Sequence, residues 1–165
     1  MKNLTESTSK SAYLYIIKLL TKKDYSEHKL RVKLGSKGYE EADIDLAIEE
    51  VISKGFLREK EYATARAKVL MKKGYHPQYI EAKLAEEQLS VTSSTINEIF
   101  EEYNMTTDSQ LSELLEKKLR IQVPSQLINA QDKIKQKLIR YCLTKGHELE
   151  DITNTLEGLL EKSNS

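Results

Sequence analysis

Residues 26–55, SEHKLRVKLGSKGYEEADIDLAIEEVISKG, contain the signals that decide the fold. Ser26 belongs to the residue types that cap helix N-termini, and Leu30 and Leu34 are spaced to share one helical face. Gly38 follows, as is typical beyond a helix C-terminus. A second apolar series with helical spacing then runs through Ile44, Ile48, Val51 and Ile52. The stretch therefore predicts two short amphipathic helices separated by a glycine turn.

Helical spacing continues through the rest of the chain, whereas strand signals are nearly absent. A helix is expected over about residues 59–73, ending at Gly74, and Pro77 suits the first position of the next helix. Thr95 with Glu98 predicts a capping box ahead of a further helix. Helices of about 10–15 residues are too short to be stable alone, so each is expected to pack on its neighbours.

An internal repeat organises these helices. The spacing of Leu30, Gly38 and Ile44 recurs at Leu138, Gly146 and Ile152, and a weaker middle copy sets Ile80, Leu84 and Gln88 against Leu30, Leu34 and Gly38. The sequence predicts an all-α protein, built as an elongated curved array of three tandem three-helix repeats. The expected bounds are a disordered tail over 1–10 and repeats over 11–56, 57–104 and 107–162.

Composition excludes several classes of protein. The formal net charge is +0, with 39% hydrophobic and 32% charged residues, which excludes a globally basic or largely disordered chain. No apolar run approaches the roughly 18 residues that span a bilayer, and the polar N-terminus lacks a signal-peptide core. The single cysteine, Cys142, excludes an internal disulfide and fits a reducing compartment. A cytoplasmic location is expected.

Charge is segregated within each predicted repeat, with basic residues in the first two helices and acidic residues in the third. Lys29, Lys33 and Lys37 share one helical face, because they are four residues apart. Such faces suit DNA phosphates or an acidic protein groove, while a solvated helix surface is the simpler alternative for any one lysine. The candidate contact residues are Lys29, Lys33, Lys37, Arg66, Lys68, Lys72, Lys73, Lys83, Lys137, Arg140 and Lys145.

Catalytic signals are missing from the sequence. The histidines His28, His76 and His147 have no cysteine, histidine or carboxylate at metal-ligand spacing. His76 is interpreted as a helix cap, and His147 as a residue at a helix junction. Cys142 falls on an apolar helix face and is interpreted as a core residue. The sequence also has no glycine-rich phosphate loop, so neither an enzyme nor a cofactor or metal site is expected.

Four ordered segments resemble the RecX family of recombinase regulators. The first unit is similar at Ser26–Leu30, Lys33-Leu34 and Lys37-Gly38-Tyr39, and the segment after it at Gly55-Phe56-Leu57 and Tyr62-Ala63. The second unit is similar at Lys73–Pro77 and Ile80–Leu84, and the third at Lys137-Leu138, Leu143 to Gly146 and Ile152. The resemblance covers nearly the whole chain from about residue 11.

Three positions depart from the family pattern. Arg58-Glu59 replaces an acidic pair, His147 stands where an aromatic residue is usual, and Gln88 replaces a stop glycine. Some family members carry a long N-terminal extension, whereas this sequence begins almost at the first repeat, which leaves open whether it is a fragment. The resemblance implies a helical array that lies in the groove of the RecA–DNA filament. It also implies that the array limits filament growth and inhibits ATP hydrolysis and strand exchange.

Two other functions stay open. A DNA-binding module is one, because basic helices in three-helix units also describe helix-turn-helix proteins. The candidate helices are rich in lysine and poor in arginine, and each third helix is acidic, so only weak DNA binding without sequence preference is expected. A helical-repeat scaffold for an unrelated protein is the other alternative. No membrane partner and no small-molecule substrate are expected.

Overall fold

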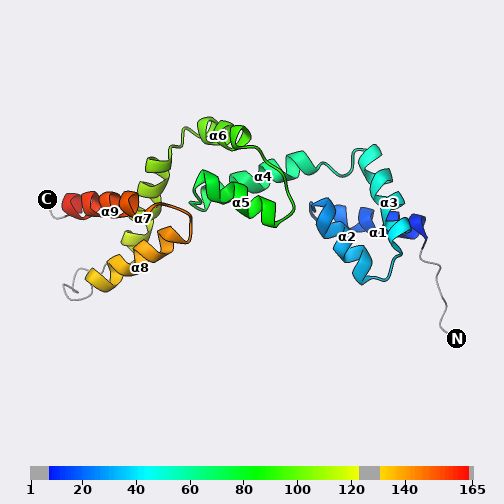
Figure 1. Ribbon diagram of the computed structural model, residues 1–165, viewed down its shortest axis with the longest axis horizontal. Helices are drawn as coiled ribbons and strands as arrows, with labels where there is room; N and C mark the ends of the chain where they lie inside the picture. The colour runs from blue at the N-terminus through cyan, green and yellow to red at the C-terminus, as the bar shows by residue number, and fades with distance from the viewer. Residues whose placement is uncertain (1–7, 123–130, 164–165) are drawn as a thin grey trace. The chain divides into compact units, whose positions relative to one another are not determined.

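The computed structural model describes residues 8–122 and 131–163, and every regular element in these ranges is an α-helix (Figure 1). The prediction of an all-α fold is confirmed. The helices are α1 (Ser9–Leu20), α2 (Glu27–Ser36), α3 (Glu41–Ser53), α4 (Glu59–Lys72), α5 (Pro77–Glu86), α6 (Ser93–Glu102), α7 (Thr107–Gln122), α8 (Gln131–Leu143) and α9 (Leu149–Ser163).

The chain divides into two compact units. Unit 1 comprises residues 1–66 and 84–91, and unit 2 comprises residues 67–83 and 92–165. In both units, statements about structure concern only residues 8–122 and 131–163. The divisions fall inside α4 and α5, so each unit includes part of the middle repeat. The repeat bounds at 11–56, 57–104 and 107–162 stay a prediction.

Unit 1 is held together by the packing of α1 and α2 on α3. Leu30 and Leu34, the two leucines that predicted α2, are fully buried, and they meet Ile44 and Ile48 of α3 in one core. Burying a leucine or isoleucine side chain contributes roughly 1.5–3 kcal/mol. The buried core of unit 1 consists of Ala12, Ile16, Tyr25, Leu30, Leu34, Ile44, Ala47, Ile48, Val51 and Leu57.

Unit 2 repeats this arrangement with its last three helices. Helix α7 packs on α9, and α8 contacts both. Leu138 and Ile152 are as completely buried as Leu30 and Ile44, which occupy the matching positions in unit 1. The repeated three-helix unit is therefore confirmed for α1–α3 and α7–α9. The buried core here consists of Leu111, Leu115, Leu138, Cys142, Ile152 and Leu156.

Helix N-termini correct two details of the sequence interpretation. Thr8 and Ser11 form a capping box, so α1 begins at Ser9 and includes two residues assigned to the tail; residues 1–7 lie outside the described ranges. The expected capping box of Thr95 and Glu98 is wrong, because α6 begins earlier. Thr92 is its cap, and the Thr92 side chain accepts a 3.2 Å hydrogen bond from the backbone N–H of Thr95.

A left-handed residue follows the second helix of each repeat, and in the middle repeat this residue is not a glycine. Gly38 has φ 88° after α2 and Gly146 has φ 85° after α8, whereas Gln88 takes φ 60° after α5. The next backbone N–H, that of Leu89, donates to the Leu84 carbonyl at 2.8 Å. Tyr39 and His147 make the equivalent bonds after Gly38 and Gly146. Gln88 therefore stands in the place of the stop glycine, as the sequence predicted. Its left-handed backbone costs conformational energy that a glycine would not cost.

Within the described ranges, no helix is both long and apolar enough to cross a membrane.

Candidate partner-binding surface

Different groups contact the three lysines that share one face of α2, which are Lys29, Lys33 and Lys37. Lys29 Nζ lies 3.5 Å from Glu87 Oε2, in an ion pair within unit 1. Lys33 Nζ lies 5.5 Å from the centre of the Tyr25 ring, within the range of a cation–π contact. Lys37, which is exposed just beyond the helix, lies 5.6 Å from the centre of the Tyr15 ring. One lysine of the stripe is thus neutralised by a carboxylate, and two are held on aromatic faces.

Arg66, a candidate contact residue, is used inside unit 1. Its guanidinium donates to both carboxylate oxygens of Glu87, with Nε 3.1 Å from Oε2 and Nη2 in close contact with Oε1. The hydrogen bonds to Arg66 lower the pKa of the Glu87 carboxyl, and the same pair raises the pKa of Arg66. Glu87 also pairs with Lys29. One carboxylate therefore binds two of the candidate residues.

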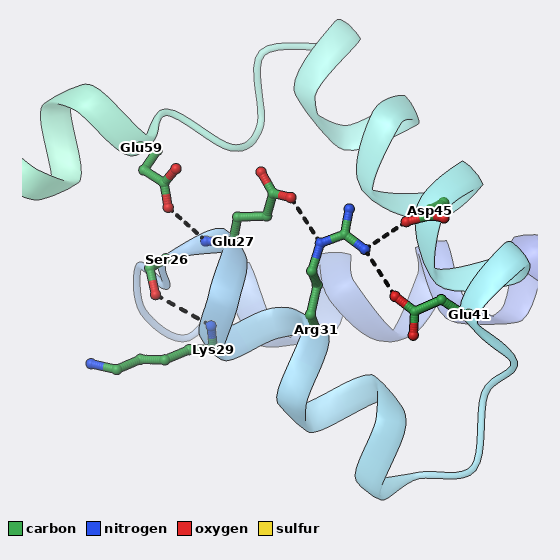
Figure 2. A network of polar contacts seen from close by, with 7 residues as sticks. All are labelled: Ser26, Glu27, Lys29, Arg31, Glu41, Asp45 and Glu59. Carbon is green, nitrogen blue, oxygen red and sulfur yellow. Dashed lines mark hydrogen bonds and ion pairs between the residues drawn. The ribbon is translucent and has the colours of Figure 1, made fainter. Parts of the chain in front are cut away.

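Figure 2 shows a polar network that fastens the start of α2 to its neighbours. Arg31 donates to Glu27 from Nε at 2.8 Å and to Asp45 of α3 from Nη1 at 2.6 Å. These hydrogen bonds raise the pKa of Arg31, that to Glu27 contributing most. The backbone N–H of Glu27 donates to Glu59 Oε1 at 3.0 Å. Glu59, the remaining acid of the Arg58-Glu59 pair, thus connects the start of α4 to the N-terminus of α2.

The lysines at the end of α4 gather around one end of α6 within unit 2. Lys68 Nζ makes an ion pair with Glu102, 2.8 Å from Oε2, and this hydrogen bond raises the pKa of Lys68. Lys72 Nζ lies 4.8 Å from the centre of the Tyr103 ring. Lys73 is exposed, and no ion pair of Lys72 or Lys73 is found in the described part of the chain. Lys72 and Lys73 are therefore the residues of this group with charge available to a partner.

A second group of lysines in unit 2 alternates with tyrosines from three helices and two turns. Lys83 Nζ lies 5.2 Å, and Lys145 Nζ 3.9 Å, from the centre of the Tyr75 ring. Lys145 also lies 5.4 Å from the Tyr141 ring, over which Lys118 lies at 4.6 Å. We call this set the lysine–tyrosine series, in the order Lys83, Tyr75, Lys145, Tyr141 and Lys118.

Tyr79 extends the aromatic part of this group. Its ring stacks on that of Tyr75, with centroids 6.0 Å apart and planes 3° apart, and Lys83 Nζ lies 5.6 Å from its centre. Tyr79 also packs directly on the turn after α8, since a Cβ built on Gly146 would lie 2.5 Å from Tyr79 Cβ. The tyrosine pair is therefore part of the packing that places Lys145.

Lys137 and Arg140 lie exposed on α8. Arg140 Nε donates to the backbone carbonyl of Gln136 at 3.3 Å, one turn earlier in the same helix. No carboxylate pairs with either residue among the described residues. Both charges are therefore available to a partner.

Buried polar groups connect the α4–α5 turn to α7 and to the turn before α9, all within unit 2. Gln110 Nε2 donates to the carbonyls of Met71 at 2.8 Å and Tyr75 at 3.0 Å. His147 Nε2 lies 2.8 Å from the Gly74 carbonyl, and the backbone N–H of His76 donates to Lys145 O at 2.9 Å. These bonds fix the backbone on which Tyr75 and Lys145 meet.

The histidines and the cysteine take structural positions. The His76 carbonyl accepts the backbone N–H of Ile80 in the first turn of α5, which fits its interpretation as a cap residue. His147 is buried at the helix junction, and burial lowers its pKa. Cys142 is fully buried in the unit 2 core, and burial raises its pKa to about 11. The described residues contain no group of histidine, cysteine and carboxylate side chains that could hold a metal ion.

The sequence identified the basic residues, but it missed the groups that decide their availability. The sequence pattern predicted no role for Glu87, Glu102 or Lys118, and none for the tyrosines that contact the lysines. One signal for the lysine–tyrosine pairs was present: Tyr25 and Lys33 have the same spacing as Tyr75 and Lys83, in the register of the weak middle copy.

Comparisons with known proteins identify a matching family model and similar relatives. Residues 12–50 match the family model described as RecX, first three-helix domain. The regulatory protein RecX of Haemophilus influenzae (strain PittEE) is 28% identical over 148 residues, which cover 90% of this chain and 94% of that protein. The regulatory protein RecX of Mannheimia succiniciproducens is 25% identical over 143 residues, covering 87% and 90% of the two chains.

Two crystal structures are similar in fold. That of RecX from Lactobacillus salivarius aligns with a TM-score of 0.62 and 19% identity, covering 94% of this chain and 98% of that one. A crystal structure of regulatory protein RecX aligns with a TM-score of 0.62 and 16% identity, covering 88% and 71%. At these identities the likeness shows that the fold is shared.

Proposed function

The chain belongs to the RecX family of regulatory proteins, and we propose that it acts by binding the RecA–DNA filament and modulating the recombinase. The expected effect is mostly inhibitory, on both ATP hydrolysis and strand exchange. The protein would thereby act in recombination, DNA repair and the SOS response. It would regulate by binding, without catalysing a reaction of its own. The observation that carries this proposal is the match to regulatory RecX proteins over 90% of the chain.

The exposed basic residues support the proposal, because a protein groove with acidic walls would attract them. Of the candidate residues, Arg66, Lys29 and Lys68 are paired with carboxylates of the chain itself. We propose that these three mainly stabilise the fold. The contact with the filament is assigned to the others, which are Lys33, Lys37, Lys72, Lys73, Lys83, Lys137, Arg140 and Lys145.

DNA-dependent ATP hydrolysis by the cognate RecA tests this function. The chain would be titrated into preformed filaments, starting well below one molecule per recombinase. Inhibition at these substoichiometric amounts is expected, since a molecule bound in or at the end of a filament affects many subunits. Unchanged hydrolysis, together with no co-sedimentation with filaments, would reject the proposal.

Charge reversal tests the assigned residues. A variant with Lys33→Glu and Lys72→Glu should bind filaments at least about tenfold more weakly, because each exchange replaces an attraction with a repulsion. Lys22→Glu with Lys60→Glu is the matched control, since both lysines are exposed and neither is a candidate contact. Equal losses in the two variants would show that net charge, and not these positions, determines binding.

A further inference from the structure

The lysine–tyrosine series differs from every other group of basic residues described above. Its lysines come from α5, α7 and the turn after α8, and its tyrosines from α8 and the α4–α5 turn. Each of the cation–π contacts within the series spans between 3.9 and 5.4 Å, and each of its lysines lies over at least one tyrosine ring. The three lysine ammonium groups are thus separated from one another by tyrosine rings.

No carboxylate of the described residues neutralises these lysines. Among the described residues, Lys83, Lys118 and Lys145 make no ion pair, whereas Lys68 of the same unit is bound to Glu102. A tyrosine face orients an ammonium group without cancelling its charge, since the attraction to the ring is only about 0.5–2 kcal/mol. The side chains are half-buried, so they lose less conformational entropy when they bind an anion.

A phosphodiester backbone is the polyanion that best fits this arrangement. Its charges recur at short, regular intervals, which suits cations held in sequence along a surface. Lysine contacts phosphate as a point charge, and the tyrosine rings hold the ammonium groups in place. The series contains no arginine, asparagine or glutamine, the residue types that read base edges, so binding would not depend on base sequence.

We propose that Lys83, Lys118 and Lys145, positioned by Tyr75, Tyr79 and Tyr141, form a binding site for the phosphate backbone of a nucleic acid. The site rests on the proposed function in one respect, since the DNA of a recombinase filament would be its ligand there. It adds a direct contact with the nucleic acid to the contact with the recombinase. The buried bonds of Gln110 and His147 support it by fixing the two turns that carry Tyr75 and Lys145.

Binding of fluorescein-labelled oligo(dT), and of a duplex of equal length, would be measured by anisotropy over a range of salt concentrations, without recombinase. The test variant replaces Lys83, Lys118 and Lys145 with Gln, and the control replaces Lys22, Lys60 and Lys162 with Gln, because these three are exposed and lie outside the series. The test variant should bind oligo(dT) at least about tenfold more weakly. Its slope of log K against log salt should fall by about two, given about 0.7 per phosphate contact on single strands. If the test variant loses only duplex binding, the site is one for double strands. If it loses binding to both probes, the site accepts single and double strands.

Two results would overturn the site. Equal losses in the test and control variants would show that binding follows net charge alone. Displacement of the oligonucleotide by polyglutamate at the same charge concentration would assign the series to an acidic protein surface. The role of the rings is tested separately: Tyr141→Phe should keep the affinity, because it keeps the aromatic face, while Tyr141→Leu should lose several-fold. Circular dichroism would confirm that each variant is folded.

Failure of this site and failure of the proposed function are distinguishable. If the lysine-to-glutamine variant keeps its affinity for both oligo(dT) and the duplex, the site is rejected whatever happens to the recombinase. If the wild-type chain binds oligonucleotide through the series and leaves RecA hydrolysis unchanged, the site stands and the regulatory proposal fails. The oligonucleotide measurement contains no recombinase, so its outcome does not depend on the regulatory proposal.

Discussion

Units 1 and 2 use similar numbers of lysines and tyrosines in different ways. In unit 1 the basic side chains with the closest contacts are bound by carboxylates: Arg31 by Glu27 and Asp45, and Arg66 by Glu87. In unit 2 the lysines of the lysine–tyrosine series lie over tyrosine rings and make no ion pair among the described residues. The carboxylates that bind Arg31 and Arg66 strengthen the packing of helices in unit 1, while within the described ranges the tyrosine rings of the series in unit 2 leave the charge of its lysines unpaired.

This difference shows that a basic stripe in a sequence is not yet a binding surface. Lys29 and Lys145 occupy comparable stripes in the first and third repeats, but Glu87 pairs with the first and Tyr75 with the second. The contact that decides the role comes from another helix or turn in each case. The predictions below change one side of this comparison at a time.

The largest effect is expected from replacing the glycine that follows the second helix in each end repeat. Both Gly38→Ala and Gly146→Ala force alanine into a left-handed backbone, which costs about 1–2 kcal/mol. At Gly146 the new Cβ would also lie 2.5 Å from Tyr79 Cβ, while nothing lies within 4 Å at Gly38. Gly146→Ala should therefore lower the free energy of unfolding by about 3 kcal/mol or more.

Urea unfolding followed by circular dichroism measures both variants, and hydrogen exchange locates the loss. Protection should fall in α7–α9 for Gly146→Ala and in α1–α3 for Gly38→Ala. Equal losses of stability would contradict the close packing of Tyr79 on the turn that carries Lys145.

The second effect is a dependence of unit 2 stability on pH. Burial lowers the pKa of His147 in the folded state below its ordinary value of 6.5. The stability that neutral His147 contributes is therefore complete above pH 6.5 and is lost as the pH falls through the lowered pKa. The slope can reach about 1.4 kcal/mol per pH unit.

His147→Gln keeps a donor for the Gly74 carbonyl but cannot titrate, so thermal unfolding of this variant should change less between about pH 7 and pH 5. His28→Gln is the control, because His28 is exposed in unit 1. If the thermal stability of the His147→Gln variant depends on pH as much as that of the wild type, His147 does not cause the pH dependence of unit 2.

The third effect comes from removing a carboxylate of unit 1, which leaves its basic residues unpaired, as the lysines of the lysine–tyrosine series are in the described part of unit 2. Glu87→Gln removes the carboxylate shared by Arg66 and Lys29, and it should cost about 1 kcal/mol at neutral pH. Because the pKa of Glu87 is lowered in the folded state, the wild type loses this advantage as the pH falls below 4.5.

The two released basic residues should also increase salt-sensitive oligonucleotide binding by unit 1. Glu86→Gln makes the same charge change next to this position, and Glu86 is exposed. Chemical denaturation and anisotropy measure the two effects. If the Glu86 and Glu87 variants behave alike, pairing by Glu87 is not what neutralises unit 1.

The smallest effect is a gain in stability. Gln88 adopts φ 60° where the first and third repeats have glycine, so Gln88→Gly should raise the free energy of unfolding by somewhat less than about 1 kcal/mol. Ala85→Gly, within the last turns of α5, should lower it by a similar amount because glycine weakens a helix. A loss of stability in the Gln88 variant would indicate that its side chain packs in a way that glycine cannot replace.

The sequence by itself determined the helices, their order and the repeat in α1–α3 and α7–α9. These features depend on local signals: Leu30 and Leu34 predict a face, Ser26 predicts a start, and Gly38 predicts an end. The same signals recur at Leu138 and Gly146, because α7–α9 bury apolar faces in a core as α1–α3 do. The error at Thr95 is of the same local kind, since Thr92, three residues earlier, is an equally suitable cap.

Only the tertiary structure decided which basic residues are available. Lys145 meets Tyr75, and Lys29 and Arg66 meet Glu87, across long separations in sequence. Helical periodicity tells which side of one helix a residue lies on, but it does not tell which residue of another helix faces it. The partners of a charge are set by how helices pack, and in the described part of this protein that packing separates the basic residues paired with carboxylates from those without such a partner.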